Sequence, residues 1–279
     1  MSVSAPDSVR VSPRPALGWP IAWAVALLAG VFLAPFPVAS MWPGGGYPSR
    51  AALVDSLTSG FVRYWDAGSG LIDPGLALPL DFWARFHVVK AVFAAVLLLV
   101  LVILGLRTWS AYTRAAIVRR RLLAGALLGV EIPLALLALL VLVANIQGAI
   151  APFSSALGLL PVGKPDHALA ETITQVRHSL ASGASDPALE TLVHDFTLYH
   201  VAMVGLGAVV TVALLAAAVL LWRRRAWMCV ESRRGRLLLA AMVVAFVMSA
   251  AFFGVVTAVN LSTVARPAPA LLGFFEGSW

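Results

Sequence analysis

Long apolar stretches separated by short polar segments dominate the chain. Five of them are long enough to cross a bilayer, since about 20 apolar residues in a helix span a hydrocarbon core of roughly 30 Å. A helix also satisfies its own backbone hydrogen bonds in lipid, and these stretches lack the alternation typical of barrel strands. The pattern therefore predicts an all-α integral membrane protein with five transmembrane helices. They run over residues 19–38, 86–106, 122–146, 201–222 and 237–261.

Composition excludes a soluble protein, because 61% of the residues are hydrophobic and 12% are charged. The net charge of +7 would favour nucleic acid if the arginines shared one surface, but they lie between the apolar stretches. We therefore expect the lipid bilayer, and no nucleic acid, as a partner. The single cysteine, Cys229, excludes a disulfide framework within one chain.

Arginine-rich connectors predict the orientation. Residues 107–121 and 223–236 join successive apolar stretches, and with the tail at residues 1–17 they hold thirteen basic residues against six in the alternate segments. Lys and Arg accumulate on the cytoplasmic side of a membrane. The N-terminus is thus expected inside and the C-terminus outside. The abundance of Ala, Leu, Val, Gly and Arg is typical of GC-rich bacteria, which favours a bacterial plasma membrane.

The first stretch, within residues 18–39, allows two interpretations. It can be a transmembrane helix that anchors the following loop. It can also be a signal peptide, because the small residues at 38–40 resemble a cleavage site and Pro35 and Pro37 are unusual in an uninterrupted span.

Two later parts of the chain resemble each other, which predicts a tandem duplication. Asp-Pro begins and aromatic-His ends both DPGLALPLDFWARFH, at residues 73–87, and DPALETLVHDFTLYH, at residues 186–200. Asn, Pro and Gly recur at one offset in NIQGAIAPFSSALGLL and NLSTVARPAPALLGFF, from Asn145 and Asn260. The modules, residues 40–160 and 161–279, each hold two spans and together predict a four-helix bundle.

The long outer segments carry apolar residues at helical spacing, which predicts amphipathic helices on the outer surface. One set lies in each module: Val54, Leu57, Phe61 and Trp65, then Leu169, Ile173, Val176 and Leu180.

His87 and His200 occupy equivalent positions in the two modules and could oppose each other. Imidazole ligates transition metals or haem iron, so haem or copper is a candidate cofactor, although no cofactor is the simpler expectation. Further candidate ligands lie upstream at Asp81, His194 and Asp195. The alternatives are that both histidines are interfacial anchors or that they sense pH or handle protons. Asn145 and Asn260 end the paired spans, where Asn caps a helix or bonds to a neighbour, and their symmetry with the histidines predicts an outer ring of two His and two Asn.

Glu131 stands near the middle of the third stretch, followed by Pro133. A carboxylate inside a membrane costs a few kcal/mol unless it is paired or protonated, so it suggests proton or ion handling. A protonated, hydrogen-bonded core residue is the alternative, because the second module has Phe246 at the equivalent position.

No nucleotide-binding, serine-hydrolase or HExxH motif is present, which argues against an enzyme. The leading hypothesis is a multi-pass accessory or assembly subunit whose outer helices engage a membrane or extracytoplasmic protein. A redox protein using His87 and His200 and a small transporter using Glu131 are the alternatives. The oligomeric state and substrate are not encoded in any motif.

Overall fold

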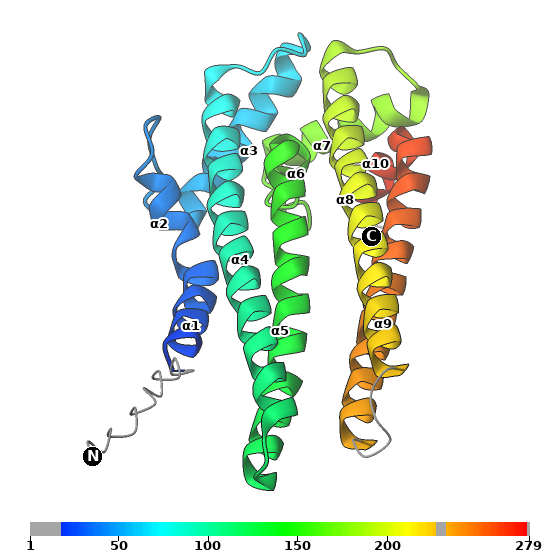
Figure 1. Ribbon diagram of the computed structural model, residues 1–279. Helices are drawn as coiled ribbons and strands as arrows, with labels where there is room; N and C mark the ends of the chain where they lie inside the picture. Colours follow the sequence, from blue (N-terminus) through cyan, green and yellow to red (C-terminus); the bar gives the residue numbers. More distant parts are fainter. Residues whose placement is uncertain (1–17, 227–232, 278–279) are drawn as a thin grey trace, which may run out of the picture.

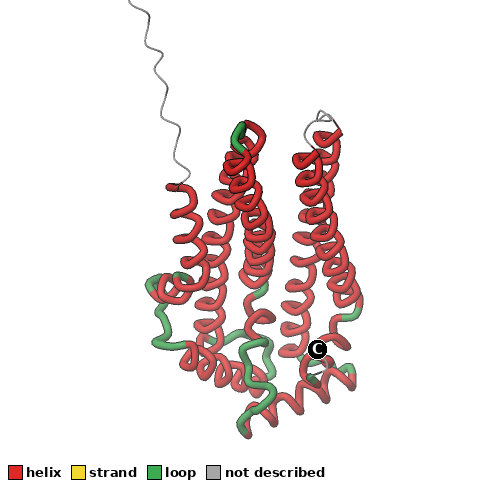
Figure 2. The backbone as a smooth tube through the Cα atoms, turned by 90° about the horizontal axis from the view of Figure 1, so that it is seen from below, coloured by secondary structure: helices red, strands yellow, loops and turns green. Residues whose placement is uncertain are grey.

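Every regular element in the described part of the chain, residues 18–226 and 233–277, is a helix in the computed structural model (Figures 1 and 2). The all-helical class is thereby confirmed. The helices are α1 (Gly18–Leu33), α2 (Pro35–Ser40), α3 (Arg50–Ala67), α4 (Pro74–Arg114), α5 (Val118–Ile150), α6 (Pro152–Leu157), α7 (His167–Ser182), α8 (Pro187–Ala226), α9 (Arg233–Ala265) and α10 (Pro267–Glu276). The predicted tail at residues 1–17, and Cys229 with the middle of the second connector, lie outside the described residues.

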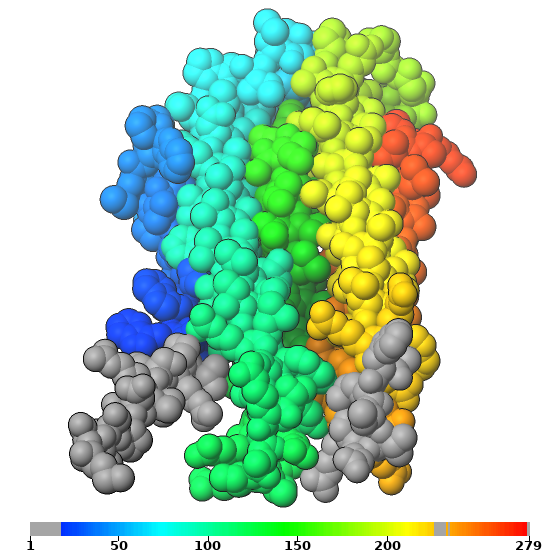
Figure 3. Space-filling model, in the orientation of Figure 1, coloured from blue at the N-terminus to red at the C-terminus, as the bar shows by residue number. Residues whose placement is uncertain are grey.

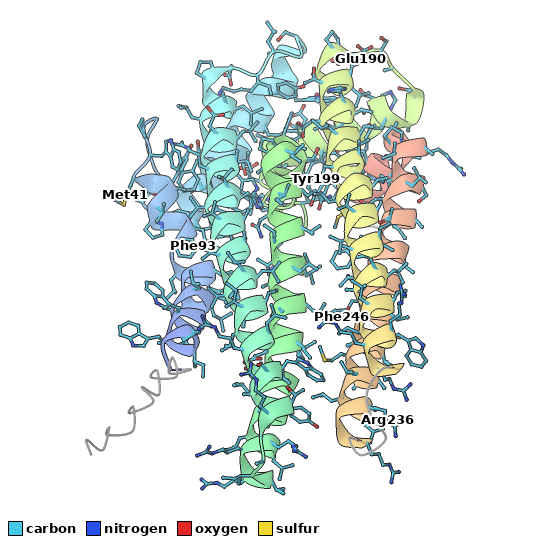
Figure 4. The ribbon with its side chains drawn as sticks, viewed as in Figure 1. Met41, Phe93, Glu190, Tyr199, Arg236 and Phe246 are labelled. Atoms are coloured by element: carbon cyan, nitrogen blue, oxygen red, sulfur yellow. The ribbon has the colours of Figure 1, made fainter. Side chains whose placement is uncertain are left out.

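Four helices are long and apolar enough to cross a membrane, and they form two hairpins, α4–α5 and α8–α9. Figure 1 shows the hairpins side by side, with the smaller helices gathered largely toward one end. We call this the cap end and the opposite one, where Arg236 lies in Figure 4, the arginine end. These lengths establish a multi-pass membrane protein.

The first predicted span is divided in the structure. α1 ends at Leu33 and measures about 24 Å at 1.5 Å per residue. Pro35 then starts the short helix α2, because proline has no N–H to continue the α1 ladder. α1 packs against α4, where a Cβ added to Gly30 would lie 2.5 Å from the Phe93 ring (Figure 4). A membrane crossing by α1 stays a prediction.

Both hairpins begin earlier than the apolar stretches indicate. α4 starts at Pro74 and α8 at Pro187, each directly after an aspartate. The Asp73 carboxylate accepts the Leu76 N–H at 2.8 Å, and the Asp186 carboxylate accepts the Ala188 N–H at 2.8 Å. The repeated Asp-Pro pairs are therefore helix starts, since the carboxylate caps free N–H groups and proline suits the first helical position.

The predicted connector at residues 107–121 is mostly helical. α4 continues to Arg114 and α5 begins at Val118, so three residues join them. Arginine is a good helix former, so both helices continue beyond their apolar stretches into the arginine-rich segment.

A cap made of α3, α6, α7, α10 and the first turns of α4 and α8 holds the largest apolar core. Its centre is fully buried Phe61, whose ring centroid lies 6.3 Å from those of both Phe153 and Phe275. Both predicted amphipathic helices are confirmed as α3 and α7, and every predicted apolar position except the half-buried Val54 belongs to this core. Figure 2 shows the cap helices running across the ends of the hairpins.

The hairpins meet mainly through α5 and α8, where Val143 and Met203 share an apolar cluster. On the face in Figure 3, α5 is a narrow strip between α4 and α8. The main contacts run in the order α1, α4, α5, α8, α9. The two predicted hairpins are therefore present, but they lie in a row and join mainly through α5 and α8. The core of the cap also joins the hairpins, because it contains residues of both α4 and α8.

Candidate functional site

The first His–Asn pair lies inside the α4–α5 hairpin toward the cap end. His87 Nδ1 lies 2.9 Å from Asn145 Oδ1, while Asn145 Nδ2 donates to the Val141 carbonyl at 2.7 Å. Because the amide oxygen accepts, the proton of the neutral ring sits on Nδ1. Gly148 permits this approach, since an added Cβ would lie 2.7 Å from His87 Nε2.

The other ring nitrogen of His87 is also engaged. Ser155 Oγ lies 2.9 Å from His87 Nε2, and Trp83 Nε1 donates to the same hydroxyl at 3.1 Å. With Nδ1 protonated, the hydroxyl donates to Nε2. His87 could therefore ligate a metal through Nε2 only by giving up the Ser155 hydrogen bond.

The second pair repeats the arrangement in the α8–α9 hairpin. His200 Nδ1 lies 2.7 Å from Asn260 Oδ1, and Asn260 Nδ2 donates to the Val256 carbonyl at 2.8 Å. The Phe196 ring contacts His200 edge-on at 4.5 Å, as the Trp83 ring contacts His87 at 4.7 Å. The hydroxyl has no equivalent, because the residue corresponding to Ser155 is Ala270.

The four predicted ring residues therefore form two separate pairs, each closing its own hairpin. Neither histidine is at the first turn of its helix: His87 lies about 20 Å from the start of α4. The hairpins are linked near this level by Gln147 Nε2, which donates to the Tyr199 carbonyl at 3.1 Å (Figure 4). Asn145 joins α5 to α4, and Asn260 joins α9 to α8. Neither asparagine is at the end of its helix, because α5 and α9 each continue for five more residues.

The upstream candidate ligands are not gathered around either histidine. Asp81 and His194 are exposed, and Asp195 Oδ2 accepts both the Ser154 N–H at 2.7 Å and the Ser154 hydroxyl at 2.9 Å. Among the described residues, no group of three or more His, Cys, Asp and Glu side chains has a geometry that could hold a metal. Asp195 instead links α8 to the start of α6.

Glu131 is buried between α4 and α5, with 3% of its surface exposed. Its Oε1 accepts the Thr108 hydroxyl at 3.0 Å, while its Oε2 is buried without a hydrogen-bond partner among the described residues. A carboxyl in this position is held by one neutral donor. Such a group is costly to ionise and stable when protonated.

Polar contacts in the cap join α3 to α7 and α8. The buried Tyr64 hydroxyl donates to the Ala188 carbonyl at 2.7 Å, and Trp65 Nε1 donates to Gln175 Oε1 at 3.0 Å. Burial raises the pKa of Tyr64 to about 12, because removal from water disfavours the phenolate.

The sequence did not indicate Ser155, Thr108 or Trp83 as partners of the predicted residues. Ser155 and Trp83 lie in the repeated segments, but their counterparts in the second module are Ala270 and Phe196. Because Ser155 and Trp83 do not recur in the second segment, comparing the two segments could not identify them as partners of His87. Thr108 and Glu131 are 23 positions apart, and nothing in their spacing marks the contact.

No protein-family model, curated protein or solved structure matches this chain.

Proposed function

We propose that the chain is a non-enzymatic accessory or assembly subunit of a bacterial plasma membrane, whose cap engages a membrane or extracytoplasmic protein. The observation that carries this proposal is the cap itself. Its buried aromatic core and cross-helix hydrogen bonds, such as Tyr64 to Ala188, make a rigid surface at one end of both hairpins. A rigid surface loses little conformational entropy on binding, which suits a docking platform.

The proposed orientation has the cap outside and the arginine end in the cytoplasm. The arginines flanking the turns of both hairpins support it, because positive residues favour the cytoplasmic side. α1 would cross from a cytoplasmic N-terminus, which places the C-terminus outside.

An ancient tandem duplication of residues 40–160 and 161–279 is part of the proposal. Three recurrences beyond apolar patterning support it: the Asp-Pro helix starts, the His–Asn pairs and the break before proline. One residue separates the end of α5 from Pro152 and the end of α9 from Pro267, and these two linking residues have similar backbone angles, φ −128° and ψ 74° against φ −143° and ψ 69°. The modules would share one orientation, as in parallel repeats.

Cysteine labelling tests the orientation. The native Cys229 belongs to the segment that joins α8 to α9 in the sequence, and Ser69→Cys in a Cys229→Ser chain places a thiol on an exposed loop of the cap. In intact cells a membrane-impermeant maleimide should label the Ser69→Cys chain, and Cys229 only after permeabilisation. The reverse pattern would refute an outward cap.

Site-specific photo-crosslinking tests the partner. A photoreactive residue at Leu71, 77% exposed on the cap, should give a discrete adduct in native membranes. The matched position Val209, 70% exposed on α8, should give none. Equal adducts at both positions, or no adduct from any exposed cap position, would contradict the accessory role.

Proton handling by Glu131 is the second candidate, supported by its burial and by the absence, within residues 18–226 and 233–277, of a hydrogen-bond partner for Oε2. Glu131→Gln preserves the side-chain volume and the acceptor for Thr108 while removing the titratable proton. Proton flux into liposomes containing the wild-type chain, abolished in Glu131→Gln, is the expected result. Equal flux in both proteins, or none in the wild type, rules the candidate out.

A redox role for His87 and His200 is the weaker hypothesis, because both ring nitrogens of His87 already have partners. An absorption spectrum and metal analysis of the purified protein test it. A Soret band or stoichiometric copper that disappears in His200→Ala would make it the leading one.

A further inference from the structure

Lys90 places a positive charge inside the apolar part of α4. It lies four residues into the apolar stretch that begins at Phe86, about 6 Å along the helix axis. Within residues 18–226 and 233–277 its ammonium makes no hydrogen bond and no ion pair, and both recorded ion pairs lie in the cap. An ammonium ion has three N–H donors and is costly to keep in an apolar medium without acceptors. Lys90 therefore requires an acceptor that the described part of the protein does not supply.

Two phenylalanine rings face this ammonium. Lys90 Nζ lies 5.9 Å from the ring centroid of Phe32, in the last turn of α1, and 5.7 Å from that of Phe86, one turn earlier on α4. Both distances are within the roughly 6 Å over which an aromatic face attracts a cation. Because α1 packs against α4, the two rings hold the charge beside the end of α1.

The charge lies where the membrane-embedded helices meet the cap. On α4, Phe86 packs in an apolar cluster with α2 and α3, whereas Phe93 packs in another with α1 and α5, and Lys90 lies between them. Figure 4 shows Phe93 beside the junction of α1 and α2, where Pro35 divides the two helices. Trp42, 51% exposed, follows α2, and tryptophan is typical of the headgroup level of a bilayer. These features indicate that Lys90 lies just below the lipid headgroups.

Arg85 adds a second positive charge on α4 nearby. Its guanidinium donates to four backbone carbonyls at 3.0 to 3.4 Å, those of Asp81, Trp42, Pro43 and Gly45. These bonds hold the loop after α2 against α4 but leave the charge in place, and no carboxylate of the described residues forms an ion pair with Arg85. A phosphate group complements two cations that lack a counter-ion.

We propose that Lys90 binds the phosphate of one anionic phospholipid at the junction of α1, α2 and α4. One acyl chain would lie along the face of α1 that carries Phe32 and Val25, which are two turns apart and 66% and 63% exposed. A zwitterionic lipid fits less well, because its own ammonium would be repelled by Lys90 and Arg85. This lipid site is independent of the proposed accessory role and of the orientation of the chain in the membrane.

Native mass spectrometry of the purified full-length chain in detergent tests the lipid site by measuring the dissociation constants of bound lipids. Dioleoylphosphatidylglycerol is the probe, and dioleoylphosphatidylcholine is the control with the same acyl chains. The wild type should bind the anionic lipid about tenfold more tightly, since a charged hydrogen bond has an effect of that order. Inorganic phosphate at the same concentration should not displace it, because the acyl chain contributes to binding.

Lys90→Met removes the charge and keeps a long, unbranched side chain. It should weaken binding of the anionic lipid by about tenfold and leave binding of the zwitterionic lipid unchanged, whereas Lys90→Arg should retain the preference. Lys164→Met is the matched control, because Lys164 is exposed in a cap loop. It should bind both lipids like the wild type, and circular dichroism should show equal helical content in all variants.

Unchanged affinity for the anionic lipid in Lys90→Met, or an equal loss in Lys164→Met, would overturn the proposed site. Displacement of the lipid by inorganic phosphate would also overturn it, since the site would then bind a free anion. Equal affinity of the wild type for the two lipids would overturn it without the use of any variant.

Discussion

The close approach of His87 to Gly148 allows a sharp test of the first His–Asn pair. In Gly148→Ala, the new Cβ would lie 2.7 Å from Cε1 and Nε2 of the ring and 2.8 Å from Nδ1. Real Cβ atoms are not found this close to other heavy atoms, so the ring must move. A displaced ring strains or breaks its hydrogen bonds to Asn145 and Ser155.

The magnitude follows from three contributions. Overpacking costs about 1–3 kcal/mol, and two weakened hydrogen bonds cost about 1 kcal/mol each at most. Alanine is a better helix former than glycine, which offsets up to about 1 kcal/mol. We therefore expect Gly148→Ala to destabilise the chain by about 1–4 kcal/mol. Gly129→Ala, on the same helix with nothing within 4 Å of the added Cβ, should be neutral or stabilising.

Denaturant unfolding in detergent measures the free energies, and ¹⁵N NMR of the imidazole reports the hydrogen bonds at Nδ1 and Nε2. A double-mutant cycle isolates the clash, because Gly148→Ala in a His87→Ala background should cost nothing. Equal stability of Gly148→Ala and Gly129→Ala, with unchanged His87 nitrogen shifts, would refute the close packing of ring and glycine.

Three further predictions concern the cap. Because the phenol of Tyr64 is neutral and buried, stability should fall as pH rises from about 10 to about 12, and Tyr64→Phe should remove that loss in alkaline unfolding curves. Asp195→Ala should cost about 1.5–3 kcal/mol and speed amide exchange at Ser154, whereas Asp195→Asn should cost less because it keeps an acceptor. Phe61→Ala should cost about 3–5 kcal/mol in denaturant unfolding through the cavity it leaves, while Leu71→Ala on the exposed loop should change little.

Local features of the fold could be predicted from the sequence. The apolar lengths of α4, α5, α8 and α9 required membrane-crossing helices, and the spacing of Leu169, Ile173, Val176 and Leu180 identified the buried face of α7. These signals are local, because helical periodicity relates residues three and four apart. The same reasoning missed the early starts of α4 and α8, where Asp-Pro caps lie in segments too polar for a membrane span.

The similarity between the two sequence segments also brought His87, Asn145, His200 and Asn260 together as one candidate group. Their equivalence was visible in the sequence, but the pairing was not. The same four residues at the same sequence positions could form either one symmetric ring or two separate pairs, so the sequence does not distinguish the two arrangements. Only the crossing of α4 with α5, and of α8 with α9, decided that each histidine meets the asparagine of its own hairpin.

What the sequence determined by itself is the four long apolar helices after the first predicted span, the charge at their ends and the amphipathic helices of the cap. Tertiary structure decided the row of helices, the Thr108–Glu131 contact and the bond from Trp65 to Gln175. The reason is that side chains facing lipid and side chains facing another helix are both apolar, so composition does not distinguish the two faces. Contacts between distant residues depend on helix crossing and register, which emerge only when all the helices pack together.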